Sequence, residues 1–385
     1  MEQTILVLGG GIGGINTAKE LSRKVGNENG INLARILVFE REKKNIFRPS
    51  LTWLMVGKRD QQEVYRDTKD IEANGIEVVL GDIESVDPEG LSVKVNGQTY
   101  TGNYMVISLG VEQSAEFNLD ESGHNFYTLD GASAFYDQLK SFKGGKIAVV
   151  VPSLPYKSPV APYEATMLVE NYIREKGLRE QTEIMLFTPE SKPMPFAGVK
   201  ISENIKELLE NKGIHYRPEY QLVSASGSEM VFKTSKKGEV TEEFQLMAYT
   251  PKHECPAVIK QTDLTGKSGW IEVDRETMAT KYPNVFAIGD ITTIPLESGE
   301  ALAKAGIFAQ HQGFTVAHNI ARHIAGKKSN KAFKGEGKYI LEMGDDQAQK
   351  VSGNFYETDV DTNNPGIIRH WEKVLFEKSW FIKNF

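Results

Sequence analysis

The strongest chemical signal in this sequence is a glycine-rich run near its start. Gly9-Gly10-Gly11-Ile12-Gly13-Gly14 satisfies the pattern G-x-G-x-x-G and directly follows the apolar run from Ile5 to Leu8. A loop of this kind makes a tight turn after a strand and lets a pyrophosphate approach the backbone, where helix amides and the helix dipole face its negative charge. We therefore predict that a dinucleotide is bound by Gly9, Gly11, Ile12 and Gly14.

An acidic residue at the end of the next strand fits the same cofactor. The apolar run from Arg35 ends in Glu40, where a carboxylate can hold ribose hydroxyls, and Arg41 follows it. Glu40 is the predicted ribose ligand, and Arg41 is a second predicted contact. The spacing from the glycines is longer than usual, which we attribute to an inserted loop at Gly26 to Gly30. This fingerprint does not separate FAD from NAD, and a glycine-rich turn that only closes a strand remains the alternative.

A second element, late in the chain, favours FAD. Val285 to Asp290 is an apolar strand that ends in Gly-Asp. It resembles the second FAD motif of flavoproteins with two dinucleotide-binding domains, in which the aspartate holds the ribityl chain and the next helix directs its positive end at the flavin. The resemblance implies FAD, with contacts from Asp290, Lys304, Ala305 and Gly110. The alternative is an ordinary buried strand capped by Asp290.

The middle of the chain lacks the loop that would bind a nicotinamide dinucleotide. In NADH-dependent relatives the first strand of the second domain leads into another G-x-G-x-x-G. Here the strand from Lys146 to Val151 leads into residues 152–164, which contain four prolines and no glycine. Proline fixes φ and removes an amide donor, so we do not expect tight NAD(P)H binding.

Four segments together resemble one enzyme family, the sulfide:quinone oxidoreductases with the flavocytochrome c sulfide dehydrogenases. They are Ala161–Glu164, Ala287–Asp290, Lys304–Ala309 and Lys373–Lys378. The resemblance runs from end to end and implies FAD, two Rossmann-like domains and a C-terminal region that faces a membrane. It also implies a redox cysteine at the head of the proline loop and another in residues 337–342, but this chain has Ser158 at the first place and no cysteine at the second. This chain therefore cannot use the family's persulfide mechanism.

Three residues are candidates for catalysis. Cys255, the only cysteine, lies where the chain re-enters the first domain and could accept sulfur, although a lone cysteine is more often a small apolar filler. Glu164 begins the helix after the proline loop and could relay protons if burial raises its pKa, or it could simply satisfy the helix dipole. Lys304 is assigned to the flavin ring by the resemblance. The histidines show no metal-ligand spacing, so we predict no metal site.

Short apolar runs alternate with helical patterns, which predicts an α/β fold with parallel sheets. We expect two Rossmann-like dinucleotide-binding domains, the FAD domain being discontinuous, and a C-terminal region with an amphipathic tail. The predicted bounds are 1–112 and 251–330 for the FAD domain, 113–250 for the second domain and 331–385 for the C-terminal region.

The tail carries a pattern that suits a membrane interface. From Trp371 the apolar residues fall mostly on one predicted helical side, with lysines between them: Trp371, Val374, Leu375, Trp380, Phe381, Ile382 and Phe385. The alternative is a helix packed on its own protein or on a second copy in a homodimer. We find no signal peptide and no apolar window long enough to span a bilayer, so we expect a cytoplasmic protein, peripheral at the inner face of the membrane.

These observations favour one function over two others. We expect a flavoenzyme that passes electrons from a small reduced donor, with sulfide inferred from the resemblance alone, through FAD to quinone. The alternatives are an NADH:quinone oxidoreductase and a non-catalytic FAD-binding scaffold that has lost its dithiol. A nucleic-acid partner is not expected, because 45 Lys and Arg residues against 52 Asp and Glu residues leave a net charge of −7.

Overall fold

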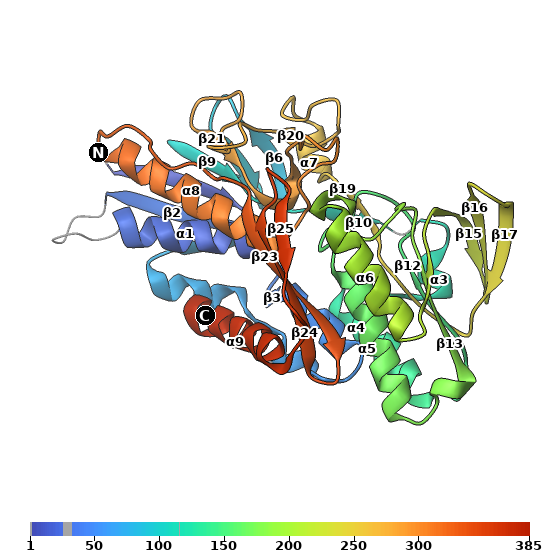
Figure 1. Ribbon diagram of the computed structural model, residues 1–385. Helices are drawn as coiled ribbons and strands as arrows, with labels where there is room; N and C mark the ends of the chain where they lie inside the picture. The colour runs from blue at the N-terminus through green and yellow to red at the C-terminus, as the bar shows by residue number, and fades with distance from the viewer. Residues whose placement is uncertain (1, 26–32, 115) are drawn as a thin grey trace.

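The computed structural model describes residues 2–25, 33–114 and 116–385, and the predicted inserted loop at residues 26–30 lies outside these ranges (Figure 1). Two five-stranded parallel sheets are its main scaffolds. The predicted α/β class with two Rossmann-like units is therefore confirmed.

The first sheet has the order β21-β9-β1-β2-β5, and all four strand pairs are parallel. Its strands are Gln3–Leu8 (β1), Ala34–Glu40 (β2), Glu77–Leu80 (β5), Tyr104–Ile107 (β9) and Val285–Ala287 (β21). The strands are apolar because helices and loops cover both faces, and Ile5 to Leu8 are fully buried. Helices α1 (Ile12–Val25) and α8 (Gly306–Ile324) lie side by side on one face (Figure 1). Since β21 and α8 come from the late part of the chain, this unit is discontinuous, as predicted.

The second sheet has the order β11-β18-β12-β13-β14, again parallel. Its strands are His124–Asn125 (β11), Gly145–Val150 (β12), Thr182–Phe187 (β13), His215–Arg217 (β14) and Leu246–Tyr249 (β18), and its helices are Leu129–Ser141 (α4), Ala161–Glu175 (α5) and Val199–Asn211 (α6). Three antiparallel strands extend from it: Tyr220–Ser226 (β15), Glu229–Thr234 (β16) and Gly238–Glu243 (β17).

An antiparallel ribbon of two strands connects the two units. β10 (Glu112–Ser114) pairs with β19 (Lys252–Glu254) where the chain leaves the first unit and where it returns. The predicted domain bounds at 112/113 and 250/251 fall at this ribbon, and we keep them as a proposal. The smaller elements are β3 (Lys44–Ile46), α2 (Leu51–Leu54), β4 (Tyr65–Asp67), β6 (Ile83–Asp87), β7 (Ser92–Val95), β8 (Gln98–Thr101), α3 (Leu119–Ser122), α7 (Ala257–Lys260), β20 (Ile271–Glu272) and β22 (Thr292–Thr293).

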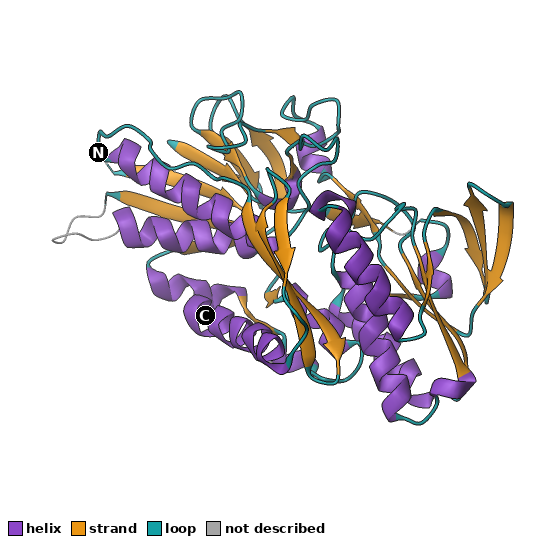
Figure 2. Cartoon of the chain, viewed as in Figure 1, coloured by secondary structure: helices purple, strands orange, loops and turns teal. Residues whose placement is uncertain are grey.

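The C-terminal region is an antiparallel sheet followed by a helix (Figure 2). The strands are Glu336–Gly344 (β23), Gln347–Asn354 (β24) and Asp359–Thr362 (β25), and the helix is Ile367–Asn384 (α9). β23 packs against α5 and α8, while α9 packs against β23, β24 and α1. The region thus bridges the helices of both parallel sheets.

The predicted single apolar side of the tail is wrong in one respect. Trp380 and Phe381 are buried against the body of the protein, whereas five other apolar residues of α9, beginning with Ile367, are exposed. Four of them, called the apolar stripe below, lie along one side of the helix and are 54 to 82% exposed: Ile368, Trp371, Leu375 and Ile382. The tail holds more apolar residues than one helical side accommodates, so packing divides them between two sides. Within the described ranges no helix combines the length and the apolar character that crossing a bilayer requires.

Candidate active site

One cavity of about 570 Å³ extends from the glycine loop after β1 to helix α9. Loops at the carboxyl ends of β1, β2, β9 and β21 supply one wall, and the proline loop with the start of α5 supplies another. This is where ligands bind in open α/β sheets. The residues that line it include ten of the predicted site residues: Gly9, Gly11, Ile12, Glu40, Arg41, Gly110, Glu164, Asp290, Lys304 and Ala305. Gly14 and Cys255 do not line it.

The glycines leave the backbone open on the cavity side. A Cβ built on Gly11 or on Gly110 would meet no atom within 4 Å, so each would project into free space. A Cβ on Gly14 would lie 1.9 Å from the carbonyl oxygen of Gly9. Gly11 and Gly110 therefore leave room for a ligand, while Gly14 permits close packing of α1 on the loop.

The carboxylate of Glu40 is held in place by backbone amides. Its Oε2 accepts a hydrogen bond from the N–H of Gly10 at 2.7 Å, and its Oε1 accepts from Arg41 at 2.8 Å and Glu42 at 3.0 Å. Asn45 donates to the Gly10 carbonyl at 2.6 Å and fixes the loop from the other side. A carboxylate has about four acceptor positions, so Glu40 keeps capacity for a ribose hydroxyl.

Asp290 presents an unsatisfied acceptor at the cavity. Its Oδ1 is buried and has no hydrogen-bond partner. Burial raises the pKa of Asp290, and the positive charges of Lys157, Lys304 and Arg48 oppose that rise. A buried oxygen without a partner is costly, and a hydroxyl-rich chain such as the ribityl of FAD would satisfy it.

Two cations that the sequence did not single out lie beside Asp290. Arg48 and Lys157 line the cavity, and Lys157 comes from the proline loop directly before Ser158. Burial, together with the charge of Arg48, lowers the pKa of Lys157 to about 7. The sequence offered a signal for Lys157, because this residue lies in the proline loop. It offered no signal for Arg48, because Arg48 reaches the cavity from a turn that carries no motif.

Lys304 has the contacts of a residue that fixes a loop. Its Nζ donates to the backbone carbonyls of Asp290 at 2.7 Å and Thr292 at 3.0 Å and lies 3.4 Å from the centre of the Trp270 ring. Burial lowers its pKa to about 8. Its carbonyl oxygen accepts from the N–H of Ser158 at 2.7 Å and so ties the proline loop to the start of α8. The ammonium group of Lys304 is thus directed to backbone carbonyls. The predicted catalytic role of Lys304 stays a prediction.

Cys255 lies in apolar surroundings next to the cavity wall. Its side chain is buried in a cluster that includes Ile259, Leu264 and Trp270. Burial raises the pKa of the thiol to about 11, so the thiol stays protonated at neutral pH. These surroundings favour the apolar filler over the sulfur acceptor, although the acceptor role stays untested.

Glu164 has a partner that sequence reasoning missed. Its Oε1 accepts from Lys373 Nζ of α9 at 2.6 Å and from the hydroxyl of Thr52, and its Oε2 accepts from the N–H of Glu342 at 3.2 Å. Burial raises the pKa of Glu164, while Lys373 and Thr52 oppose the rise. The direction of the pKa shift agrees with the prediction, and Glu164 also lies in the first turn of α5, so its proton-relay role and its helix-dipole role both stay predictions. Glu164 and Lys373 both line the cavity, next to Phe376 of α9.

Comparison with known proteins identifies the family. The sequence model described as "Pyridine nucleotide-disulphide oxidoreductase" matches residues 3–319. The chain belongs to this family. It is 26% identical to the mitochondrial sulfide:quinone oxidoreductase of Mus musculus over 78% of this chain and 68% of that protein, and 22% identical to the sulfide-quinone reductase of Aquifex aeolicus over 100% and 92%. The predicted resemblance is confirmed.

Solved structures share the fold. The crystal structure of the sulfide:quinone oxidoreductase from Aquifex aeolicus matches with a TM-score of 0.87 at 20% identity, covering 99% of this chain and 91% of that one. NDH2 from Plasmodium falciparum, solved in complex with NADH, matches with a TM-score of 0.77 at 14% identity, covering 98% and 94%.

The chain is therefore an FAD-dependent oxidoreductase. Its residues fit the cofactor: Gly11 and Gly110 leave room for it, Glu40 has acceptor capacity for the ribose, and Asp290 has an unpartnered oxygen for the ribityl chain. FAD supplies the two-electron chemistry of such an enzyme, and the protein supplies its binding, orientation and electrostatics.

Proposed function

We propose that this enzyme reduces a membrane quinone with electrons from a small reduced anion, sulfide being the first candidate. The observation that carries the proposal is the extent of the cavity. It begins at the glycine loop and ends at Lys373 and Phe376 on α9, the helix whose outer side bears the apolar stripe. A quinone that leaves the bilayer beside α9 would enter the cavity at that end.

The outer surface of α9 supports attachment to a membrane. The apolar stripe recurs at Ile368, Trp371, Leu375 and Ile382, so it follows one side of the helix, and the exposed Lys378 and Lys383 flank it. An exposed apolar side with neighbouring lysines and a tryptophan lies in the headgroup region of a bilayer. We propose peripheral attachment at the inner, cytoplasmic face of the membrane through this helix.

The second parallel sheet argues against NADH as the donor. Glu190 lies three residues after the end of β13, near the carboxyl end of the strand where such sheets hold a ribose-binding acid, while Glu40 is the last residue of β2. One oxygen of Glu190, Oε2, accepts from Tyr163 at 2.5 Å, Tyr156 at 3.0 Å and Thr188 at 3.2 Å, and the side chain is buried. Burial raises the pKa of Glu190 to about 7.

The two tyrosines come from the proline loop and the helix after it, the segment that would have to wrap the nucleotide. Tyr156 and Tyr163 thus already bond to the acid that a nucleotide ribose would need. This favours the quinone enzyme with a small donor over the NADH:quinone alternative.

The cations beside Asp290 support an anionic donor. Arg48 and Lys157 line the cavity next to Ser158. Arg48 attracts an anion such as hydrosulfide, and Lys157, whose pKa is about 7, does so in its protonated form. Because Cys255 is not among the lining residues, sulfur would be carried away by a second sulfide ion. Two HS⁻ then give HS₂⁻, one proton and two electrons, and no protein persulfide is formed.

Anaerobic absorbance of the purified yellow protein tests the donor. We expect sulfide to bleach the flavin band and NADH in a second cuvette to leave it unchanged. A Lys157→Met variant should need more sulfide for the same rate, with a Lys267→Met variant, at an exposed position outside the cavity, as the matched control. Rapid bleaching by NADH would contradict the proposal and restore the alternative.

A further inference from the structure

The two cations beside Asp290 come from different units of the fold. Arg48 lies between β3 and α2 of the first unit, whereas Lys157 lies in the proline loop of the second. Both line the cavity, and the charge of Arg48 contributes to the lowered pKa of Lys157, so the two groups are close enough to repel each other. Within the described part of the chain the ammonium of Lys157 makes no hydrogen bond or ion pair. Other contacts must therefore hold these two like charges in one cavity.

Tyr127 contacts the segments that carry both cations. Its backbone carbonyl accepts from Arg48 Nη1 at 3.3 Å, and its hydroxyl donates to the carbonyl of Lys157 at 2.9 Å. The same hydroxyl lies 3.5 Å from the carbonyl oxygen of Ser158, and Tyr127 itself lines the cavity. One residue thus joins the side chain of Arg48 to the turn that carries Lys157 and Ser158.

The turn at Ser158 needs such support. Its φ of 56° lies in the left-handed region, which costs free energy for a residue other than glycine unless surrounding contacts impose it. The Ser158 N–H donates to the carbonyl of Lys304 at 2.7 Å, and the Tyr127 hydroxyl donates to the carbonyl of Lys157. Loss of the Tyr127 hydroxyl would take a donor away from a buried carbonyl and leave the turn held through its amide alone.

Tyr127 is itself fixed in place. Its N–H donates to Asn125 Oδ1 at 3.0 Å, and its ring packs edge-on against His253 of β19, with the ring centres 5.3 Å apart. Burial, as the largest cause, and three nearby carboxylates raise the pKa of Tyr127 well above its ordinary value, so its hydroxyl remains a hydrogen-bond donor throughout the neutral range. These carboxylates belong to Glu190, Glu164 and Asp290.

We propose that Tyr127 is the positioning residue of the electron-donor site, holding Arg48 and the Lys157–Ser158 turn so that both cations face a single anion. This rests on the proposed function, in which that anion is the reduced electron donor. A bound anion relieves the repulsion between the two cations, and Tyr127 keeps them in place before it arrives. No cysteine lines the cavity, so charge rather than a thiolate recognises the anion.

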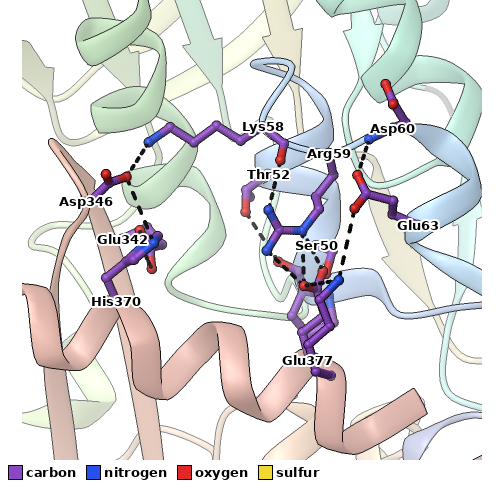
Figure 3. A network of polar contacts seen from close by, with 12 residues as sticks. Ser50, Thr52, Lys58, Arg59, Asp60, Glu63, Glu342, Asp346, His370 and Glu377 are labelled. Atoms are coloured by element: carbon purple, nitrogen blue, oxygen red, sulfur yellow. Dashed lines mark hydrogen bonds and ion pairs between the residues drawn. The ribbon is translucent and has the colours of Figure 1, made fainter. Parts of the chain in front are cut away.

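The quinone end of the cavity is held by other contacts. On α9, Glu377 accepts from Arg59 at 2.9 Å (Figure 3), and Lys373 pairs with Glu164 at 2.6 Å. The Tyr127 hydroxyl donates to none of these residues. Its removal should therefore alter the reaction with the electron donor and leave the reaction with quinone unchanged.

The test compares Tyr127→Phe with Tyr104→Phe. The hydroxyl of Tyr104 is also hydrogen-bonded, to His323 at 2.9 Å, but Tyr104 does not line the cavity. Each substitution removes one hydroxyl and keeps the ring and the backbone carbonyl, so both variants should fold. Thiocyanate, an inert monoanion, is titrated into each oxidised FAD-loaded protein while the flavin absorbance is recorded. Each protein is also reduced anaerobically by sulfide at a series of concentrations in a stopped-flow instrument.

We expect Tyr127→Phe to weaken anion binding without slowing the later steps. The dissociation constant of thiocyanate and the sulfide concentration that gives half the limiting rate should both rise about tenfold, as the loss of one buried hydrogen bond implies. The limiting rate of flavin reduction and the rate of reoxidation by quinone should stay close to those of the wild type. Tyr104→Phe should match the wild type in all four quantities.

The titration of Lys157 gives a readout that fold stability alone does not move. It is followed by NMR in protein with labelled lysine side chains, and the Lys157 signal is the one that Lys157→Met lacks. The wild-type pKa should be about 7, and the variant's should rise towards the ordinary 10.5 as the turn relaxes away from Arg48 and towards solvent. The protonated amine attracts the anion, so wild-type thiocyanate binding should weaken as the pH rises through 7, and Tyr127→Phe should lack that step. The charged groups that act on Lys157 are Arg48 and Asp290.

Three results would overturn the positioning role: wild-type thiocyanate affinity in Tyr127→Phe, an unshifted Lys157 titration in that variant, or a wild-type protein to which thiocyanate does not bind. A wild-type protein that binds thiocyanate but is not reduced by sulfide would instead refute the proposed electron donor. The thiocyanate affinity and the Lys157 titration would then still decide whether Tyr127 positions the two cations.

Discussion

Two glycines of the same glycine-rich run, one before helix α1 and one inside it, are expected to respond in opposite ways to an added methyl group. Gly11→Ala places a Cβ where no atom lies within 4 Å, and Gly11 is not among the residues with positive φ. The apoprotein should accept it and gain up to about 1 kcal/mol of unfolding free energy, because alanine restricts the unfolded chain. Gly14→Ala places a Cβ 1.9 Å from the Gly9 carbonyl oxygen, and a backbone atom cannot move aside easily. We expect that substitution to cost about 1–3 kcal/mol.

The two substitutions should affect FAD affinity in the opposite order, with Gly11→Ala weakening FAD binding more than Gly14→Ala. The methyl group of Gly11→Ala occupies the space through which a phosphate reaches the loop amides, and losing one hydrogen bond to a charged group costs about 1.5–3 kcal/mol. That corresponds to a dissociation constant raised about tenfold to 150-fold. Fluorescence titration of apoprotein with FAD measures the affinity, and urea unfolding of the apoprotein measures the stability. Wild-type FAD affinity in Gly11→Ala, or wild-type stability in Gly14→Ala, would refute the roles assigned to them.

Three further predictions follow from the site and from α9. Asp290→Ala should leave the fold intact and raise the FAD dissociation constant about tenfold or more, since it removes the acceptor for a ribityl hydroxyl; the same FAD titration measures it. Replacing Leu375 and Ile382 with serine should lower the affinity for anionic lipid vesicles, measured by sedimentation, about 150-fold or more, because each buried aliphatic side chain contributes about 1.5–3 kcal/mol; unchanged binding together with a lost dimer would assign the stripe to a second copy of the chain. Lys373→Met should destabilise the protein by about 3–5 kcal/mol at pH 8, because buried Glu164 loses its cation. Since burial raises the pKa of Glu164 above its ordinary 4.5, the folded state binds the proton more tightly, and the loss of melting temperature should shrink as the pH falls towards 5.

Local patterns predicted the half of the site that holds the cofactor. Gly9 directly follows β1, Glu40 is the last residue of β2 and Asp290 lies three residues after the end of β21. Parallel strands bring their carboxyl ends to one edge, so local sequence was sufficient to place these residues. Glu164 and Lys373 meet across 209 positions, and no periodicity specifies such a contact. The tail shows the same limit, since sequence alone did not reveal that Trp380 packs inward while Trp371 faces outward.

The role of single residues also depends on their surroundings. Lys304 and Cys255 are in the segments where they were predicted, but backbone carbonyls hold the ammonium of Lys304 and apolar neighbours bury the thiol of Cys255. Arg48 and Lys157 supply positive charge to the cavity that the sequence motifs did not predict. Residue type identified candidates, and only the packed structure distinguished those that face the cavity.

Reoxidation of the reduced protein by quinone tests the central claim most directly. The flavin is first reduced anaerobically with a stoichiometric amount of sulfide or, if sulfide does not react, with dithionite, and a short-chain quinone is then mixed in. We predict that the flavin band returns within one turnover as one quinol forms per flavin, and that the rate rises with quinone concentration and saturates. A flavin band that stays bleached in the presence of quinone, or a rate that never saturates, would contradict a quinone site at the α9 end of the cavity.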